Sequence, residues 1–149
     1  MMKTVAEWKH NFIEYFILGA IGGCTYTTIE VWYRGYSHWS MTILAAIVFI
    51  AIGMLNEGMD WDTPFGLQML YGGLIATGLE FVAGCILNLW LGWDIWDYSN
   101  MPFNILGQVC LPFFFVWCGL AAVIIIADDV IRWKVFGEEK PRYVFWFKG

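Results

Sequence analysis

The sequence predicts an all-α polytopic membrane protein with four transmembrane helices. Hydrophobic residues make up 60% of the chain and charged residues 14%, whereas soluble domains carry about 25% charged residues. Four apolar runs can be marked, at about 11–33, 39–56, 64–91 and 105–127. A helix needs about 20 apolar residues to cross ~30 Å of hydrocarbon, and each run meets that length or nearly does. The polar stretches between the runs are too short to form a second folded domain.

The basic residues predict how these helices are oriented. The first run follows Lys9 without the cleavage pattern of a signal peptide, so we expect it to be a retained span. With four spans both termini lie on one side, and that side carries Lys3, Lys9, Arg132, Lys134, Lys140, Arg142 and Lys148. Only Arg34 lies on the other side. Because cytoplasmic segments are rich in Lys and Arg, we expect both termini in the cytoplasm.

The polar ends of the chain are expected to carry no domain of their own. Residues 1–136 would form the four-helix transmembrane domain, and residues 137–149 a short cytoplasmic tail. The basic residues after Asp128 indicate a solvated extension that lies along the membrane surface, because such residues are attracted to anionic lipid. The net charge of −5 comes from scattered acids, so we expect no nucleic-acid partner.

The first and third runs share a polar pattern at an offset of 50 residues. The matched positions are Gly22 and Gly72, Gly23 and Gly73, Thr27 and Thr77, and Glu30 and Glu80. This spacing suggests a tandem pair of two-helix hairpins related by an axis along the membrane normal. In both runs the small residues and the acid fall at three- and four-residue steps, on one helix face. We expect the two faces to pack on each other, with both glutamates in the outer half of the bilayer.

Glu80 and Glu30 are the leading candidates for functional residues. A charged side chain near the middle of a span costs roughly 2.5–3.5 kcal/mol on insertion scales, so it normally faces a partner, a cavity or a proton path. Glu80 has no basic residue within two turns of its own run, and we favour a functional role for it. Glu30 precedes Arg34 by four residues, the favourable order for a helical ion pair. A structural ion pair and a functional role are therefore both open for Glu30.

Five more polar residues are predicted near the same region: His38, Asn88, Asp97, Asn104 and Gln108. Asn88 falls on the Glu80 face. Unperturbed histidine titrates near neutral pH, so the residue type at position 38 could serve a proton step, although for His38 a contact with lipid headgroups is the simpler interpretation. Asp97 and Asn104 are typical of turns and helix caps. Gln108, placed within the fourth run, is expected to hydrogen-bond across helices.

Several kinds of chemistry are not expected. The chain lacks the Walker motif G-x-x-x-x-G-K-[ST], and also G-x-S-x-G and H-E-x-x-H. Its four cysteines lie in apolar runs without a C-x-x-C pair, so we expect buried free thiols. The acidic segment 56–62 lacks the spacing of a calcium loop and is expected to be solvated. We therefore expect no ATP hydrolysis on this chain, no metal and no cofactor.

A longer set of motifs resembles a known family. It runs from Glu30 through R-G-Y-S-H-W at 34–39, and then through Thr77–Glu80, Gly84 and Asn88. The most specific part is W-D-Y-S at 96–99 followed by Pro102, Asn104, Gly107, Gln108 and Cys110. This pattern is similar to bacterial proteins described as putative ABC-transporter type IV or putative ABC transporter permease, over about Tyr15 to Trp133. The resemblance implies a small multi-span protein of the bacterial plasma membrane, and it names no substrate.

Two functional interpretations from different classes follow. The first is a small integral membrane transport component, working as a homo-oligomer or beside a separate ATPase subunit, with Glu30, Arg34, Glu80 and Gln108 lining a polar path. Small multidrug antiporters offer an architectural parallel, since four-helix subunits pair there around a membrane glutamate. The second is a scaffold or accessory subunit in which the polar cluster only fixes helix packing. An enzyme is disfavoured, because no nucleophile and base occur at a recognisable spacing.

Overall fold

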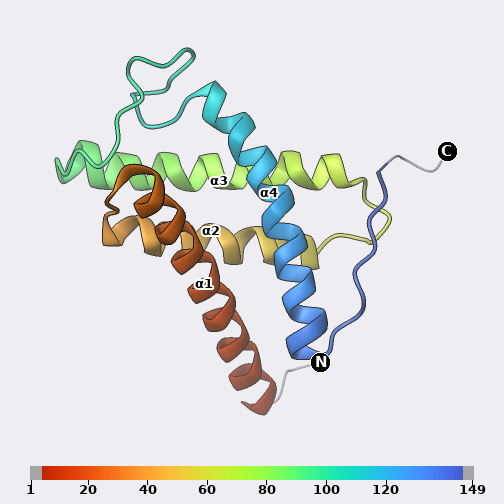
Figure 1. Ribbon diagram of the computed structural model, residues 1–149. Helices are drawn as coiled ribbons and strands as arrows, with labels where there is room; N and C mark the ends of the chain where they lie inside the picture. Colours follow the sequence, from red (N-terminus) through yellow and green to blue (C-terminus); the bar gives the residue numbers. More distant parts are fainter. Residues whose placement is uncertain (1–4, 146–149) are drawn as a thin grey trace.

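The computed structural model describes residues 5–145, with side chains from residue 11 onward, and is all-helical (Figure 1). The helices are α1 (Val5–Arg34), α2 (Trp39–Glu57), α3 (Phe65–Gly84) and α4 (Leu111–Ile131), with two π-helical extensions, η1 (Cys85–Trp90) after α3 and η2 (Arg132–Phe136) after α4. Each of the four is long and apolar enough to cross a membrane. The predicted fold class is therefore confirmed.

The fourth helix begins later and ends later than the sequence predicted. Residues 105–110 belong to a loop, in which Ile105 and Val109 form an isolated β-bridge and Gly107 has a φ of +69°. Pro112 then falls in the first turn of α4, where its missing N–H costs nothing. At the other end, the apolar helix continues past Asp128 and Asp129 because both acids are buried with partners. The placement of Gln108 inside the fourth helix was therefore wrong.

The four helices form two hairpins that pack on one another. Helix α1 packs mainly on α2, and α3 mainly on α4, while α2 also contacts both α3 and α4. In Figure 1, α2 and α3 run side by side, and α1 and α4 cross in front of them. The buried core lies along these crossings and includes Val48, Ile52, Ala76, Ala121 and Ile125. Helices α1 and α4 touch each other over only a few residues.

The matched glycines of the first and third helices mark the helix crossing in each hairpin. A Cβ atom on Gly22 would lie 2.5 Å from the Cβ of Phe49 in α2, and one on Gly72 would lie 2.6 Å from the Cβ of Ala121 in α4. The small-residue face of α1 thus packs on α2, and that of α3 packs on α4. The expectation that these two faces meet each other was wrong, because each is already covered by the next helix of its own hairpin.

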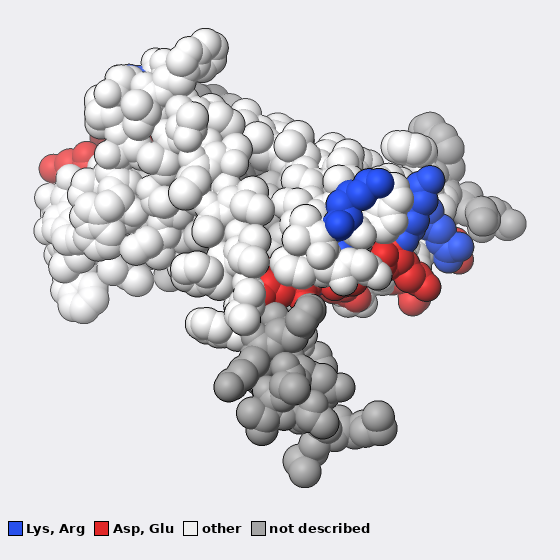
Figure 2. Space-filling view, turned by 60° about the horizontal axis from the view of Figure 1, so that its bottom comes forward, with Lys and Arg blue, Asp and Glu red and all other residues white. Residues whose placement is uncertain are grey.

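Most of the described charged residues gather at one end of the molecule. Figure 2 shows Lys, Arg, Asp and Glu side chains clustered there, next to a wide surface without charge. We call it the Arg132 end, and the opposite end, at the close of α1, the Arg34 end. Lys3, Lys9 and Lys148 lie outside the described side chains. Of the four cysteines expected to be buried free thiols, only Cys110 is buried; Cys85 and Cys118 are half-buried and Cys24 is exposed.

The described part of the tail is anchored to the bundle. The backbone N–H of Phe65 donates to the carbonyl of Val144 at 2.7 Å, and the rings of Phe65 and Tyr143 pack 5.0 Å apart. Tyr143 also donates its hydroxyl to Asp129 at 2.8 Å. The tail therefore crosses back over the start of α3, so the expectation of a merely solvated extension was wrong for this segment.

Candidate functional site

Glu80 is a buried carboxylate held by two neutral donors. It lies on α3 and is 3% exposed. The hydroxyl of Tyr98, in the loop before α4, donates to Oε1 at 3.0 Å, and the indole N–H of Trp117, on α4, donates to Oε2 at 2.9 Å. Burial, and then the Glu80 carboxylate, raise the pKa of the Tyr98 hydroxyl, which keeps it protonated as a donor. Within residues 11–145, no Lys, Arg or His forms an ion pair with Glu80.

Glu30 is also buried, but it has a cationic partner. Arg34 donates Nη1–H to Oε1 at 2.9 Å, one turn further along α1, and Ser37 donates its hydroxyl to Oε2 at 2.5 Å. The guanidinium of Arg34 lies 5.0 Å from the ring centre of Tyr36. The ion pair expected from the i,i+4 spacing is therefore present.

The two glutamates line one cavity, although the helix faces that carry them do not meet. The cavity has a volume of about 120 Å³ and lies at the Arg34 end. Its charged lining residues are Glu30, Glu80 and Arg34, and its aromatic lining residues are Tyr26, Trp96, Tyr98, Phe113 and Trp117. With all three charged groups ionised, two negative charges face one positive charge. We call this space the Glu80 cavity.

Asn88 and Gln108 hold the loop that covers this cavity. The Asn88 amide donates to the carbonyl of Trp96 at 3.0 Å and to Oε1 of Gln108 at 2.9 Å, and it accepts from the N–H of Ile95 at 2.8 Å. The Trp96 indole donates to the backbone carbonyl of Gln108 at 3.0 Å. Neither amide lines the Glu80 cavity. Gln108 was expected to hydrogen-bond from the fourth helix to another helix. It does bond to Asn88, which follows α3, but it lies in a loop.

Replacing Asn88 with leucine is expected to loosen this loop. The change leaves the half-buried Trp96 carbonyl and Ile95 N–H without their partner, and an unpaired polar group costs about 1–3 kcal/mol when it is fully buried. Limited proteolysis should then cut within 91–110 at least several-fold faster than in the wild type. The matched control is Asn100→Ala, an exposed position in the same loop, which should leave the rate unchanged.

The remaining predicted residues organise turns at the same end. His38 caps α2, and its Nδ1 accepts from the N–H of Ser40 at 3.3 Å while its ring packs near Trp93. Asp97 accepts from the backbone N–H and the hydroxyl of Ser99, and these hydrogen bonds lower the pKa of the exposed Asp97 carboxyl. Asn104 bonds to backbone groups of its own loop. The structure thus gives all three of them local partners outside the Glu80 cavity.

A second polar cluster lies at the Arg132 end and was missed by the sequence analysis. Arg132 is 4% exposed and donates Nε–H to Asp128 at 2.7 Å and Nη1–H to Glu14 at 2.6 Å. Glu138 lies 3.4 Å from Nη1 and Glu57 lies 3.7 Å from Nε. One guanidinium therefore joins α1, α2, α4 and the tail. The i,i+4 spacing of Asp128 and Arg132 was the available signal, but the helix was expected to end before it.

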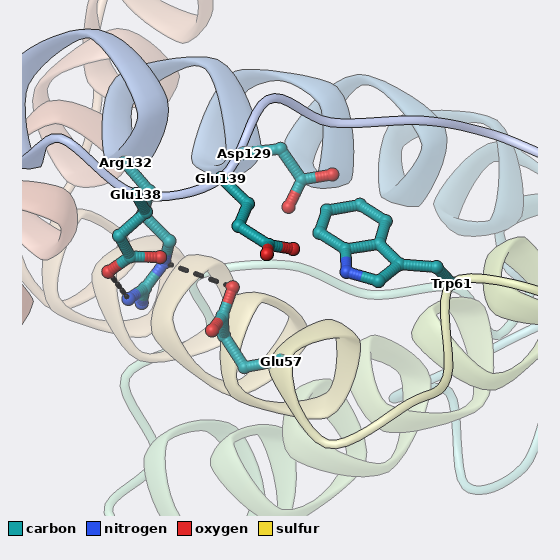
Figure 3. Close-up of a pocket in the computed structure, with 6 residues that line it drawn as sticks. All are labelled: Glu57, Trp61, Asp129, Arg132, Glu138 and Glu139. Carbon is teal, nitrogen blue, oxygen red and sulfur yellow. Dashed lines mark hydrogen bonds and ion pairs between the residues drawn. The ribbon is translucent and has the colours of Figure 1, made fainter.

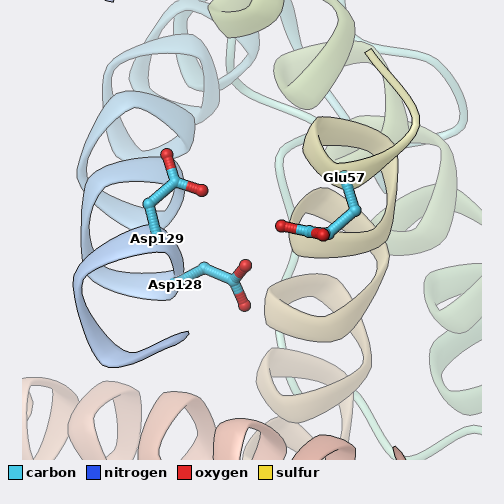
Figure 4. A group of neighbouring side chains, drawn as sticks. All are labelled: Glu57, Asp128 and Asp129. Atoms are coloured by element: carbon cyan, nitrogen blue, oxygen red, sulfur yellow. The ribbon is translucent and has the colours of Figure 1, made fainter. Parts of the chain in front are cut away.

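An acidic pocket of about 310 Å³ lies beside this arginine (Figure 3). Its lining residues are Glu57, Trp61, Asp129, Arg132, Glu138 and Glu139. Oxygens of Glu57, Asp128 and Asp129 lie within 4.8 Å of one another. Figure 4 shows these three side chains, from α2 and α4. Asp129 accepts from the Asn56 amide at 2.5 Å, so segment 56–62 is not purely solvated as expected. Because Arg132 already supplies the positive charge beside Asp128 and Glu57, we assign no metal to these oxygens.

Comparison with known proteins agrees with the motifs in the sequence. A family model described as "Putative ABC-transporter type IV" matches residues 10–146. The chain belongs to this family. The match spans all four helices, the covering loop and the described tail, and it makes the protein a membrane protein of a transporter-type family. No match was found among curated proteins or among solved structures.

Proposed function

We propose that the chain is the membrane-embedded component of a transport system, and that the Glu80 cavity is part of the path its substrate takes. The observation that carries the proposal is the state of Glu80: a carboxylate buried within a span, facing a cavity, with no cationic partner in the described chain. Such a group in a membrane normally serves a pathway. The orientation proposed is the one that the basic residues indicate, with both termini in the cytoplasm of a plasma-membrane protein and the Glu80 cavity in the outer half of the bilayer.

The size of the cavity bears on the partners of the protein. Pockets for drug-sized ligands measure about 300–1,000 Å³, and the Glu80 cavity has about 120 Å³. The Glu80 cavity of one copy therefore has room for an ion or a small head group only. A larger passage requires a second copy of the chain or another membrane subunit. Since the sequence lacks a Walker motif, any ATP hydrolysis would be supplied by a separate ATPase subunit, and we propose no enzymatic activity for this chain.

One observation favours the alternative, a scaffold or accessory subunit. The bonds from Glu80 to Tyr98 and Trp117 tie α3 to α4 and to the covering loop, which is the behaviour of a packing residue. A glutamine at this position would still accept from one donor and would keep the shape of the side chain. Replacing the charge while keeping the shape therefore separates the two functions.

We expect Glu80→Gln to abolish transport without unfolding the protein. The purified protein would be reconstituted in liposomes, and charge movement would be recorded on a supported membrane with ammonium, methylammonium, sodium and imposed pH gradients. The wild type should give a signal with at least one of these, and Glu80→Gln should reduce it at least tenfold, because the ionised carboxylate is lost. The melting temperature of the variant in detergent should stay within a few degrees of the wild type.

The control is Asp97→Asn, which removes an exposed acid in the covering loop and should leave the signal unchanged. Flux at the wild-type level in a folded Glu80→Gln protein would instead support the scaffold.

A further inference from the structure

We propose that the Glu80 cavity takes the charged head of an amphipathic organic cation, and that the hydrocarbon part of this substrate enters from the membrane between α1 and α4. The substrate class rests on the proposed function, since it assumes that Glu80 lies on the path. Three features of the molecule favour this class of substrate: the charge of the cavity, its aromatic walls, and an apolar opening that leads to it.

The charge of the cavity suits a single positive charge. Arg34 already neutralises Glu30 through the 2.9 Å ion pair, so the excess negative charge belongs to Glu80. Both Glu80 oxygens accept one hydrogen bond from a neutral donor, and a carboxylate oxygen has room for a further contact. A buried carboxylate without a cation is costly, and a bound monocation would relieve that cost.

The walls of the cavity suit an organic cation rather than a metal ion. Five of its twelve lining residues are aromatic: Trp96, Trp117, Tyr98, Tyr26 and Phe113. Aromatic faces attract alkylammonium groups through the ring quadrupole, and they do so more strongly where water is excluded. A small metal ion would instead require several oxygen ligands. Besides its two carboxylates, the oxygen atoms available to a metal ion in the cavity are the Tyr98 and Tyr26 hydroxyls and backbone carbonyls.

An apolar crevice adjoins the Glu80 cavity on the side that faces the membrane. It has a volume of about 180 Å³ and is lined by Ile21, Thr25 and Ile29 of α1 and by Val123, Ile124 and Ala127 of α4, among others. We call it the α1–α4 crevice. Tyr26, Trp117 and Leu120 line both spaces, so the two adjoin. Because α1 and α4 touch over only a few residues, and because Ile29 and Val123 are exposed, the crevice opens to the hydrocarbon region.

Each of the two spaces would hold one part of the substrate: the Glu80 cavity its charged head and the α1–α4 crevice its hydrocarbon chain. The Glu80 cavity is too small for a drug-sized molecule but can take a substituted ammonium group, and the crevice offers apolar walls for a chain attached to it. A neutral lipid chain could fill the crevice but would leave Glu80 without a counter-charge. The occupant to which the structure points is therefore a single-chain amine or quaternary ammonium compound.

The test measures binding, independently of transport. The full chain would be placed in nanodiscs of phosphatidylcholine and titrated with dodecyltrimethylammonium by calorimetry, with empty nanodiscs subtracted. We expect saturable binding at one site, at least tenfold weaker in Glu80→Gln. Tetramethylammonium, which has the head alone, should bind more weakly than the chain-bearing cation. Dodecyl maltoside, which has the same chain on an uncharged head, should not compete.

A second pair of variants keeps the test valid if Glu80→Gln does not fold. Val123 is exposed and lines the crevice, so Val123→Trp should fill it and weaken dodecyltrimethylammonium at least fivefold, with little effect on tetramethylammonium. The control is Leu74→Trp, at an exposed position on α3 outside the crevice, which should bind as the wild type does.

Three results would overturn the proposal: no saturable binding, equal affinity in Glu80→Gln, or competition by dodecyl maltoside, which would make the crevice a neutral lipid site. Failure of the proposed function has a different signature. Glu80-dependent binding without any flux would leave the ligand class standing and remove the transport role. Glu80-dependent flux of sodium or protons, without binding of dodecyltrimethylammonium, would leave the transport role standing and remove the ligand class.

Discussion

Replacing Arg132 with alanine is expected to lower the free energy of unfolding by about 3–5 kcal/mol, the largest loss of any single substitution considered for this protein. The change removes the charged partner of Asp128, which is 0% exposed, and of the buried Glu14. Asp128 would then be buried without its charged partner, Glu14 would lose its contact with Arg132, and α1, α2, α4 and the tail would lose their common contact. Unfolding by SDS in mixed micelles, followed by circular dichroism, measures the effect.

The control for this substitution is Arg34→Ala at the opposite end. Arg34, like Arg132, pairs with an acidic residue four positions earlier, but its side chain is 37% exposed, and an ion pair of this kind contributes about 0–1 kcal/mol. The loss should therefore be several-fold smaller than for Arg132. Equal losses in the two variants would show that burial does not set the strength of the Arg132 contacts. The loss in free energy of unfolding for Arg132→Lys should lie between those for Arg132→Ala and Arg34→Ala. The lysine keeps the positive charge, but its ammonium cannot reach all of the carboxylates at once.

Replacing Gly73 with alanine is expected to cost about 1–3 kcal/mol through overpacking between α3 and α4. A Cβ atom at this position would collide with Sγ of Cys118 and would lie 3.1 Å from both its Cα and its backbone nitrogen. Rotation of the Cys118 side chain cannot relieve the contacts with its backbone, so the two helices would have to separate. The same unfolding measurement should show the loss.

Gly78→Ala is the matched control, on the same helix and with the same chemical change. Apart from its chain neighbours and the backbone of its own helix turn, no described atom lies within 4 Å of a Cβ atom built there. Alanine is a better helix former than glycine by about 0.8–1.0 kcal/mol in water, so stability should stay the same or rise. A loss at Gly78 as large as that at Gly73 would rule out helix contact as the cause and point instead to a general need for glycine in α3.

Local pattern predicted much of the architecture and one contact of the candidate site. Long apolar runs give the four spans, because only a helix satisfies its own backbone within hydrocarbon. The Glu30–Arg34 ion pair follows from the helical repeat, since residues four apart lie on the same face. The burial of Glu80 was also predicted, because a carboxylate in a long apolar run has few inexpensive places to lie.

The partners of these groups could not be predicted in the same way. Tyr98 and Trp117 lie 18 and 37 residues from Glu80, and nothing in their local sequence marks them as donors to it. The small-residue faces of α1 and α3 were assigned to each other, although each could be covered equally well by the next helix. Arg132 looked like a surface residue, because a basic residue after an apolar run normally is one.

Hydropathy and spacing are properties of the chain, and they were enough to predict four helices long and apolar enough to cross a membrane, which end is basic, and the burial of Glu80. Which side chain meets which depends on how the helices cross, and that is set by contacts between residues far apart in the chain. The cavity shared by Glu30 and Glu80, its aromatic walls and the buried Arg132 all arise from such contacts. These features form only when the two hairpins pack together, because each is made by residues of several helices.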